Sequence, residues 1–331
     1  MPHTAALIAT TLNCRSELER SLRSICREDN LERVEELVVV DGGSDDGTVE
    51  LLSDWARRVP SLRHVVSPGA NISRGRNQAI ESTRCEIIVC WDTGCEYPAG
   101  YVPGMLQPFD DPRVDVVGAR TIATGETPYE RSLVRFYDRR EASDRTNPSH
   151  RAIAYRRTVW TRVGGYPEQV EAGEDSWFNA RWHALGLHYE LSPRAEVRWR
   201  VRGDWASTAR MARRNARGHF TLRVGAGRRI LLTVTALYTS LVPAIVAAAW
   251  SALPLGCWVV GYAGYVAYRL SRGGRWRGLV SPRDWFYGWA AMSALDVGTT
   301  VGVCQGLIAG RFGRIRSAVT ARGGSLRRGS R

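Results

Sequence analysis

The sequence contains no lysine, so arginine supplies all 46 of its basic residues. Against 33 acidic residues this gives a net charge of +13, a balance found in proteins that bind nucleic acid, anionic lipid or acidic substrates. No Cys-x-x-Cys pair occurs, which argues against a zinc site, and the seven cysteines are an odd number. We interpret them as reduced thiols in a reducing compartment.

The N-terminus also has no basic segment before its first apolar run, so we expect no signal peptide and a cytosolic N-terminal part. No internal repeat is found, and low complexity is confined to the Arg/Gly/Ser-rich tail after Arg311. A length of 331 residues allows a sizeable core and about two domains.

Short apolar runs alternate with helical patterns over the first 120 residues or so. The predicted strands are Ala5–Thr11, Leu37–Val40, Leu62–Val66, Glu86–Cys90 and Val114–Gly118. This alternation predicts βαβ units and a mostly parallel, Rossmann-like α/β sheet. Ligands of such sheets bind beyond the carboxyl ends of the strands, which are here the loops that open with Asp41 and Asp92. From about residue 120 to 205 the apolar runs are fewer, and a helix is expected at Glu174–Leu187.

The last third of the sequence is predicted to be a helical membrane module. Leu231–Trp250 is long enough to span a bilayer, and Leu253–Tyr268 is marginal. A third apolar segment, Trp285–Gly310, carries Asp296, which would cost about 2.5–3.5 kcal/mol at the bilayer centre unless it is paired. Its Gly-x-x-x-Gly spacings are typical of closely packed helices.

Arginines flank these apolar segments. They are Arg210, Arg213, Arg214, Arg217, Arg223, Arg228 and Arg229 before the first segment, Arg269, Arg272, Arg275 and Arg277 after the second, and Arg311, Arg314 and Arg316 after the third. The positive-inside rule places all three clusters in the cytosol, which favours a two-span hairpin followed by an interfacial or re-entrant third segment. Three full spans and a buried hairpin of a soluble protein are the alternatives. Attraction to anionic lipid explains the basic charge without nucleic acid.

Acidic residues mark three places where chemistry is expected. Asp41 and Asp92 directly follow predicted strands, and Glu174 and Asp175 open a predicted helix. Each has an ordinary structural explanation, because aspartate forms turns and acids complement helix N-termini. Their order and spacing along the chain are more specific than any one of them.

Five segments carry a resemblance to a known family. They are ALIATTLN at 6–13, ELVVVDGGSDDGT at 36–48, GANISRGRNQAI at 69–80, IIVCWDTGCEYP at 87–98, and VGGYPE followed by GEDSWFNARWHALG at 163–186. Over residues 5–205 the chain resembles a family 2 glycosyltransferase with the GT-A fold. The resemblance implies a nucleotide-sugar donor, UDP-linked by preference, with GDP- and dTDP-sugars as alternatives.

The resemblance also implies roles for individual residues on the donor side. Asp41 would hydrogen-bond the base of the donor, and Thr10 and Asn13 would line the same pocket. Arg76 is placed to neutralise the diphosphate, which a guanidinium can bind through two hydrogen bonds.

On the acceptor side, Asp175 matches the family's catalytic base, which is needed because a sugar hydroxyl is a poor nucleophile at neutral pH. The diphosphate would leave from the opposite face, so that configuration inverts. Glu174 would orient Asp175 or touch the acceptor.

Asp92 matches the first acid of the family's Asp-x-Asp motif, but the second position is Gly94. A divalent ion, Mg²⁺ or Mn²⁺, is still expected. Asp92 can be its one protein ligand, because Mg²⁺ keeps several waters in its coordination shell. The alternatives are a contribution from Glu96, or Arg76 in place of part of the metal's role.

Processive members of the family carry a Gln/Arg-x-x-Arg-Trp motif, and here Arg198-Trp199 is present with Ala195 at the polar position. This favours addition of a single sugar. Trp199 is predicted to shape the acceptor site, with packing at the membrane interface as an alternative. His150 is an acceptor candidate too, the alternative being a solvated loop histidine.

These inferences divide the chain into five parts: 1–120, the donor-binding half; 121–205, the acceptor-binding half; 206–228, a basic interfacial helix; 229–310, membrane segments; and 311–331, a basic tail. We predict a glycosyltransferase of the cell membrane whose catalytic domain is cytoplasmic and whose acceptor is lipid-linked or a glycan. The alternatives are an inactive nucleotide-sugar-binding scaffold and a processive polysaccharide synthase.

Overall fold

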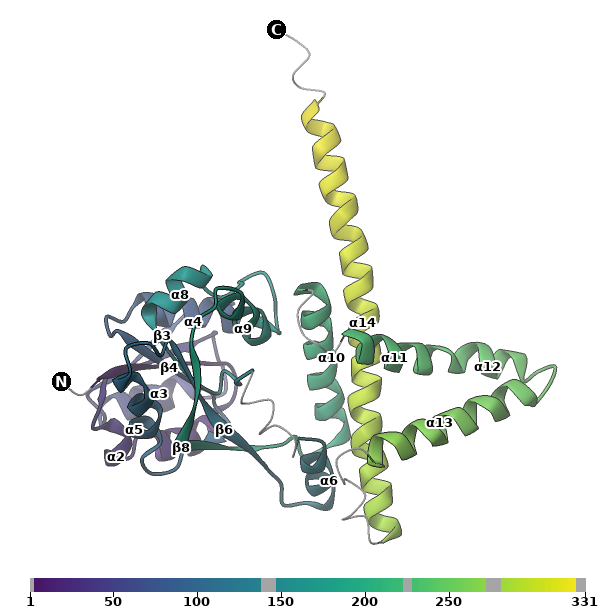
Figure 1. The fold of residues 1–331 in the computed structure, drawn as a ribbon, viewed down its shortest axis with the longest axis horizontal. Helices are drawn as coiled ribbons and strands as arrows, with labels where there is room; N and C mark the ends of the chain where they lie inside the picture. Colours follow the sequence, from purple (N-terminus) through teal and green to yellow (C-terminus); the bar gives the residue numbers. More distant parts are fainter. Residues whose placement is uncertain (1–2, 138–146, 223–227, 272–280, 326–331) are drawn as a thin grey trace. The chain divides into compact units, whose positions relative to one another are not determined.

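The computed structural model describes residues 3–137, 147–222, 228–271 and 281–325 (Figure 1). The chain divides into two compact units, Met1–Gly203 and Asp204–Arg331. Several arginines predicted to flank the apolar segments, Arg223, Arg272, Arg275 and Arg277, lie outside the described residues, and the side chains of Arg228, Arg229, Arg311, Arg314 and Arg316 are not described either.

The first unit is built on an eight-stranded mixed sheet with the strand order β3-β2-β1-β4-β7-β6-β8-β5. The strands are β1 (Ala5–Thr11), β2 (Val34–Asp41), β3 (Leu62–Val66), β4 (Ile87–Trp91), β5 (Cys95–Glu96), β6 (Val116–Thr124), β7 (Ala152–Arg156) and β8 (Tyr189–Arg200). The first four are parallel, as predicted, and β7 is antiparallel to both β4 and β6. The strands β1, β2 and β4 are buried on both faces, which explains their continuous apolar runs.

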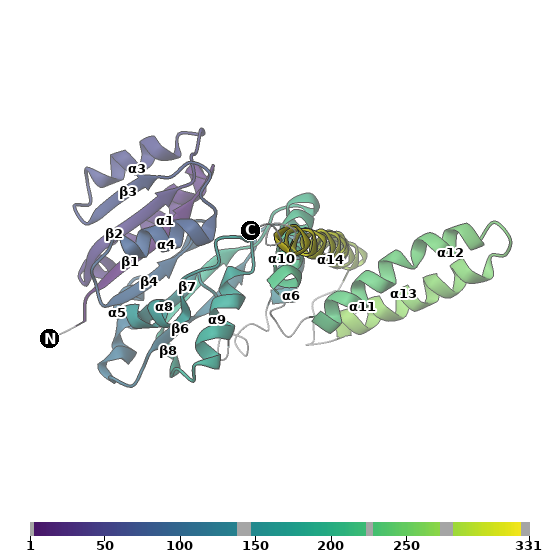
Figure 2. The same ribbon diagram turned by 90° about the horizontal axis from the view of Figure 1, so that it is seen from above.

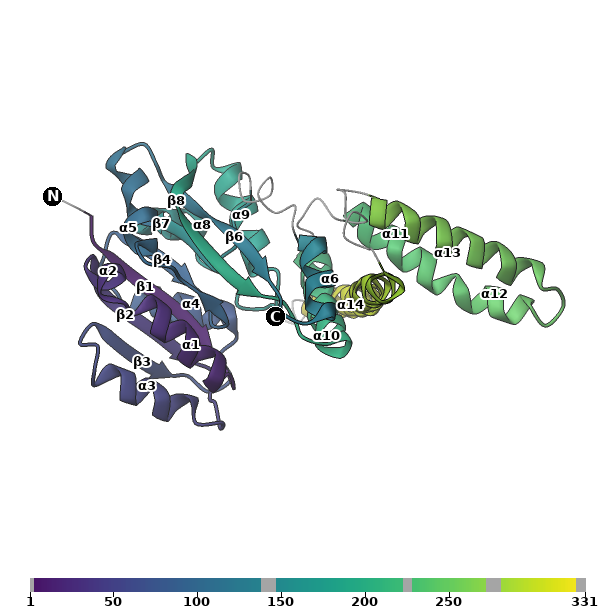
Figure 3. The ribbon, with the colours of Figure 1, turned by 90° about the horizontal axis from the view of Figure 1, so that it is seen from below.

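Helices cover both faces of this sheet. They are α1 (Arg15–Ile25), α2 (Glu28–Leu31), α3 (Thr48–Ala56), α4 (Ile72–Glu81), α5 (Tyr101–Leu106), η1 (Gln107–Asp110), α6 (Pro128–Tyr137), α8 (Arg157–Val163) and α9 (Glu174–Ala184). One apolar core joins α4, α8 and α9 to β1, β2, β4 and β7 (Figure 2). On the opposite side α1 and α2 lie in front of the sheet when it is seen from below (Figure 3).

A glycine allows α4 to approach β1 closely. A Cβ atom on Gly75 would lie 2.6 Å from Cγ2 of Thr10, so no larger residue fits there without a shift of the helix. The helix begins after Asn71, whose side-chain oxygen accepts a hydrogen bond from the backbone N–H of Arg74. These local features fix the position of Arg76, one turn further along α4.

The second unit is helical, with α10 (Trp205–Leu222), α11 (Arg228–Thr239), α12 (Leu241–Ala247), α13 (Leu253–Ser271) and α14 (Pro282–Ser325). The α11–α12 segment and α13 form a hairpin (Figure 2). Helix α14 continues to Ser325 and so includes most of the segment expected to be a basic tail. Among the described residues one helix, Pro282–Ile308, is long and apolar enough to cross a membrane by length and composition. The expected span Leu231–Trp250 contains only the shorter apolar helix Leu232–Ala247, and Leu253–Val266 is shorter too.

Candidate active site

The loops that follow β1 and β2 are joined to each other at the carboxyl end of the sheet. Thr11 pairs with Asp41 at the end of the parallel ladder. Beyond it, Asn13 adopts a left-handed backbone conformation (φ 48°) and donates its N–H to Oγ of Ser44 at 2.8 Å. The side-chain oxygen of Asn13 accepts a hydrogen bond from the N–H of Asp45 at 3.0 Å. The predicted neighbours of the donor base are thus held in one rigid pair of loops.

Asp41 is completely buried and organises its own loop. Its Oδ1 accepts hydrogen bonds from the N–H groups of Gly43 and Ser44, at 2.9 and 2.7 Å. Its Oδ2 accepts one from the Ser44 hydroxyl at 2.5 Å. Asp41 therefore acts as a turn former here. Contact with the donor base stays a prediction, and it requires an oxygen that now accepts from within the loop.

Arg76 connects two of the three predicted acidic places. Its Nη2 lies 3.0 Å from Oδ1 of Asp92, and its Nη1 lies 2.9 Å from Oε1 of Glu174. The residue is 3% exposed, and burial alone would lower its pKa, but Asp92 and Glu174 raise the pKa above its ordinary value. The guanidinium is also 5.5 Å from the ring centre of Tyr166. Its predicted contact with the diphosphate stays a prediction, because both ends of the guanidinium already bind carboxylates.

The acidic pair opens helix α9. Glu174 is buried, which raises its pKa, as do Asp175 and Asp92, while Arg76 opposes the shift. Asp175 is half-buried, and its Oδ1 accepts a hydrogen bond from the N–H of Ser176 at 2.6 Å. The neighbours thus differ in environment: Glu174 points to the interior cation, and Asp175 lies closer to solvent, where an acceptor could reach it.

The side chain of Asp92 is 33% exposed and is placed by the aromatic residue Tyr97, whose hydroxyl accepts a hydrogen bond from the N–H of Asp92 at 2.8 Å. Gly94 has a φ of 81°, in the left-handed region that favours glycine, and its N–H donates to Ser21. An aspartate at this position would be strained, which gives a physical reason for the missing second carboxylate. Within the described parts of the chain no three acidic, His or Cys side chains gather in a way that could hold a metal ion.

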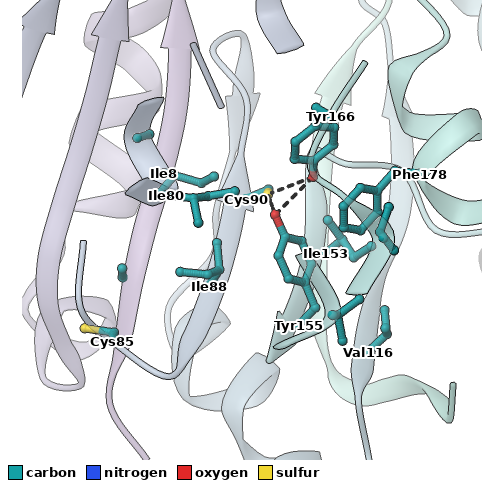
Figure 4. Close-up of a cluster of buried hydrophobic side chains, with 14 of the residues drawn as sticks. Ile8, Ile80, Cys85, Ile88, Cys90, Val116, Ile153, Tyr155, Tyr166 and Phe178 are labelled. Atoms are coloured by element: carbon teal, nitrogen blue, oxygen red, sulfur yellow. Dashed lines mark hydrogen bonds between the residues drawn. The ribbon is translucent and has the colours of Figure 1, made fainter. Parts of the chain in front are cut away.

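A chain of buried polar groups runs from the core to α9. Figure 4 shows its inner end, where Cys90, Tyr155 and Tyr166 are hydrogen-bonded to one another. The Tyr166 hydroxyl then lies 2.8 Å from Nδ1 of His150, and Nε2 of His150 lies 2.9 Å from Oδ1 of Asn179. Asn179 is one helical turn after Asp175, so this network holds the helix that carries the predicted base.

His150 is 1% exposed, so the alternative of a solvated loop histidine is wrong. Burial, with a contribution from Arg76, lowers its pKa to about 4, and the imidazole is neutral at pH 7. Direct contact with the acceptor stays a prediction, and both ring nitrogens already have protein partners. The sequence did not point to Asn179, although its spacing of four from Asp175 places both on one face of the helix.

Trp199 lies in β8, where it pairs with Ala123 of β6 and Cys95 of β5. It is 8% exposed and packs edge-on against Tyr137, with ring centres 4.9 Å apart. This interior position within the sheet argues against the alternative of a membrane-interface residue. The guanidinium of Arg151, which the sequence did not single out, is 4.2 Å from the centre of the Trp199 ring.

Comparison with known proteins agrees with this architecture. Residues 6–168 match the family model described as glycosyl transferase family 2. The uncharacterized glycosyltransferase YfnE of Bacillus subtilis (strain 168) is 30% identical over 89 residues, which are 27% of this chain and only 22% of YfnE. The chain therefore spans about a fifth of the length of this curated relative.

Two solved structures are also similar. The mannosyltransferase PcManGT from Pyrobaculum calidifontis, in complex with GDP-Man and Mn²⁺, has a TM-score of 0.59 and 22% identity, over 90% of this chain and 86% of that one. TarS of S. aureus, residues 1–349 in complex with UDP-GlcNAc, has a TM-score of 0.48 and 15% identity, over 63% and 64% of the two chains. The predicted fold is confirmed, and residues 6–168 of the N-terminal unit form a glycosyl transferase family 2 domain with the GT-A fold.

Proposed function

We propose that this protein transfers one sugar from a nucleotide-sugar donor to an acceptor hydroxyl, with inversion at the anomeric carbon. The observation that carries the proposal is the pair of ion pairs made by Arg76, which joins Asp92 to Glu174 although the two are far apart in sequence. The result is a compact acidic site at the carboxyl end of the sheet, where ligands of such folds bind.

In this mechanism Asp175 accepts the proton of the acceptor hydroxyl. It is half-buried and adjacent in sequence to Glu174, which Arg76 holds in place. The acceptor oxygen attacks the anomeric carbon as the bond to the diphosphate breaks, and attack from the opposite face inverts the configuration. The network through His150 and Asn179 keeps α9 in position for this step.

A divalent ion can bind at Asp92 together with the substrate, which would supply its other ligands. Asp92 supplies one carboxylate, of which Oδ1 is paired with Arg76, and Mg²⁺ is commonly held by one or two carboxylates together with substrate phosphates and water. When bound, the ion would stabilise the negative charge that develops on the leaving diphosphate.

We further propose that the second unit binds a membrane and that the acceptor is lipid-linked. The α11–α13 hairpin exposes large apolar side chains along its length, including Val246, Trp250, Leu253 and Val260, at 57–82% exposure. Exposed apolar surface on this scale is costly in water and favourable in lipid. The second unit follows the catalytic unit directly in the chain, at Asp204, so a membrane-bound second unit would tether the catalytic unit to the bilayer.

Contacts within the second unit favour the two-span topology, with α14 at the membrane surface. Helices α10 and α14 run in the same direction, because Trp205 donates to Ser293 while Phe220 lies beside Gly306 further along. Four exposed arginines of α10 accompany this part of α14: Arg210, Arg213, Arg214 and Arg217. If α14 crossed the bilayer, each of them would cost up to about 2.5–3.5 kcal/mol near its centre.

The partner of Asp296 supports the same topology. Its carboxylate lies 3.1 Å from Nη1 of Arg269 and accepts a hydrogen bond from Tyr265. Arg269 follows the apolar part of α13, at the base of the hairpin. The middle of α14 would therefore lie at the level where the hairpin leaves the membrane, on the cytoplasmic side.

The test is a transfer assay with the full chain in lipid nanodiscs. Wild type and Asp175→Asn receive UDP-, GDP- and dTDP-sugars, Mg²⁺ or Mn²⁺, and a lipid extract, and mass spectrometry follows lipids that gain sugar mass. We expect one added sugar with wild type and at least a ~100-fold lower rate with the variant, since general-base catalysis contributes about 10²–10⁴-fold.

Each other outcome identifies an alternative. Products with a ladder of added sugars would indicate a processive synthase. Nucleotide-sugar binding without any transfer or release of nucleoside diphosphate, equal in both proteins, would indicate an inactive scaffold.

A further inference from the structure

Arg151 is a cation of the active-site region whose guanidinium has donors without a hydrogen-bond partner among the described residues. Its Nε and Nη1 atoms are buried and have no hydrogen-bond partner among the residues that the structure describes. A guanidinium stays protonated at any physiological pH, so these donors cannot be relieved by loss of a proton. Burying charged donors without an acceptor is costly, and such groups are found where a ligand completes them.

The position of Arg151 is fixed beside Asp92. The antiparallel ladder of β4 and β7 ends at the pair Trp91–Ala152, so Asp92 and Arg151 are the next residues of the two strands. The hydroxyl of Tyr97 joins them, because it accepts from the N–H of Asp92 at 2.8 Å and donates to the carbonyl of Arg151 at 3.0 Å. Arg151 thus lies at the carboxyl end of β4, within the site.

Trp199 holds the guanidinium from one side. The centre of its ring is 4.2 Å from Cζ of Arg151, a cation–π distance, and such contact leaves the N–H groups of the guanidinium available for an anion. Asp92 is not that anion in the free protein, because it pairs with Arg76 and accepts no hydrogen bond from Nε or Nη1 of Arg151. Arg76 in turn is held by Asp92 and Glu174, whereas Nε and Nη1 of Arg151 have no hydrogen-bond partner among the described residues.

We propose that Arg151, held against Trp199, binds a phosphate group of a substrate through its guanidinium. Arginine and phosphate form strong charge-assisted hydrogen bonds, and a phosphate would supply acceptors for guanidinium donors that lack a partner in the described residues. The proposal rests on the proposed function in its choice of ligand, and the phosphate belongs either to the donor's diphosphate or to a phosphorylated lipid acceptor.

The experiment measures binding to the full chain in nanodiscs. The donor arm uses UDP, GDP and inorganic pyrophosphate, with uridine and guanosine as phosphate-free references. The acceptor arm uses a polyprenyl phosphate and the matching polyprenol. The variants are Arg151→Gln and Arg151→Lys, and the matched control is Arg120→Gln, which removes a half-exposed arginine of β6 that is paired with Glu196.

We expect Arg151→Gln to weaken binding of the phosphate probes of one arm by about 10- to 100-fold, the range for charge-assisted hydrogen bonds. Affinity for the phosphate-free molecules should not change. Arg151→Lys should keep part of the affinity, because it keeps the charge and loses the planar guanidinium that lies over Trp199. Loss confined to the first arm assigns the phosphate to the donor, and loss confined to the second assigns it to the acceptor.

Stability without ligand separates this role from a structural one. Because two buried donors of Arg151 lack a hydrogen-bond partner in the described residues, their cost offsets the contact with Trp199, and Arg151→Gln should melt close to the wild-type temperature or above it. A melting temperature well below that of Arg120→Gln, unchanged affinity for every phosphate probe, or wild type that binds none of them would each overturn the proposal. None of these readouts requires sugar transfer, so an inactive protein with a working phosphate site would refute the proposed function alone.

Discussion

Replacement of Arg76 by glutamine tests the central feature of the site. Arg76 and Glu174 form an ion pair whose side chains are 4% and 9% exposed, so water cannot replace the lost cation. Removing one partner of a buried pair costs about 3–5 kcal/mol, because the remaining charge stays buried. Asp92 is a third exposed and adds little, since solvent screens its charge. In a unit of this size the loss lowers the melting temperature by roughly 6–20 °C.

The effect should depend on pH. Burial already raises the pKa of Glu174, and loss of Arg76 raises it further. A carboxyl group whose folded pKa exceeds its unfolded value binds a proton more readily when folded, so the folded state gains stability as the pH falls between these values. The deficit of Arg76→Gln relative to wild type should therefore narrow from about pH 8 to about pH 5.5, as measured by thermal unfolding of the full chain.

Two further variants make this test specific. Arg74→Gln lies on the same helix and removes an arginine that is 51% exposed and paired with Glu168, so its cost should stay below about 1 kcal/mol. The double variant Arg76→Gln, Glu174→Gln removes both charges and should recover most of the lost stability. The reasoning is refuted if Arg76→Gln is as stable as Arg74→Gln, or if its deficit is the same at both pH values.

Two more predictions concern packing and buried polar groups. A Cβ atom on Gly302 would lie 2.2 Å from the carbonyl oxygen of Arg213, so Gly302→Ala should separate α10 from α14 and lower the free energy of unfolding by about 1–3 kcal/mol. The control is Gly256→Ala, which has open space around it and should be neutral or slightly stabilising. Thermal melts of the full chain in detergent measure both variants. Because the pKa of His150 is lowered to about 4, the folded state resists its protonation, and stability should fall by up to about 3 kcal/mol as the pH drops from about 6.5 to about 4. Urea unfolding of His150→Gln should lack this part of the pH dependence, and an unchanged pH profile would contradict the assignment.

The sequence predicted the first half of the sheet better than the second. Strands β1 and β3 have the expected bounds, because their apolar runs are continuous and lie between clear turn residues. Strand β8 was missed because its buried and exposed positions alternate among arginines, and no apolar run identifies it. Its parallel partner β6 is separated from it in sequence by β7, and a pattern along the chain gives no indication of such pairing.

The same limit applies to the site. The order of Asp41, Asp92 and Asp175 could be read from the sequence because each follows a strand or opens a helix. The ion pair of Arg76 with Glu174 joins residues 98 positions apart and depends on how α4 and α9 pack on one face of the sheet. The burial of His150 could not be foreseen either, because its flanking segment is polar.

Charge balance connects two features of this site that the family pattern does not predict: Gly94 at the position of the second carboxylate, and the buried donors of Arg151. The site contains three acidic side chains, Asp92, Glu174 and Asp175. Arg76 forms ion pairs with the first two, so one positive charge faces three negative ones. A bound diphosphate would therefore add negative charge to a site that is already acidic. A second carboxylate at position 94 would attract a metal ion to offset this, but the left-handed backbone there favours glycine over aspartate. Arg151 supplies positive charge at the same strand end, from the neighbouring strand β7. If the donor arm of the binding experiment assigns the phosphate to the donor, part of the charge that stabilises the leaving diphosphate comes from a fixed guanidinium, which needs no second carboxylate to hold it.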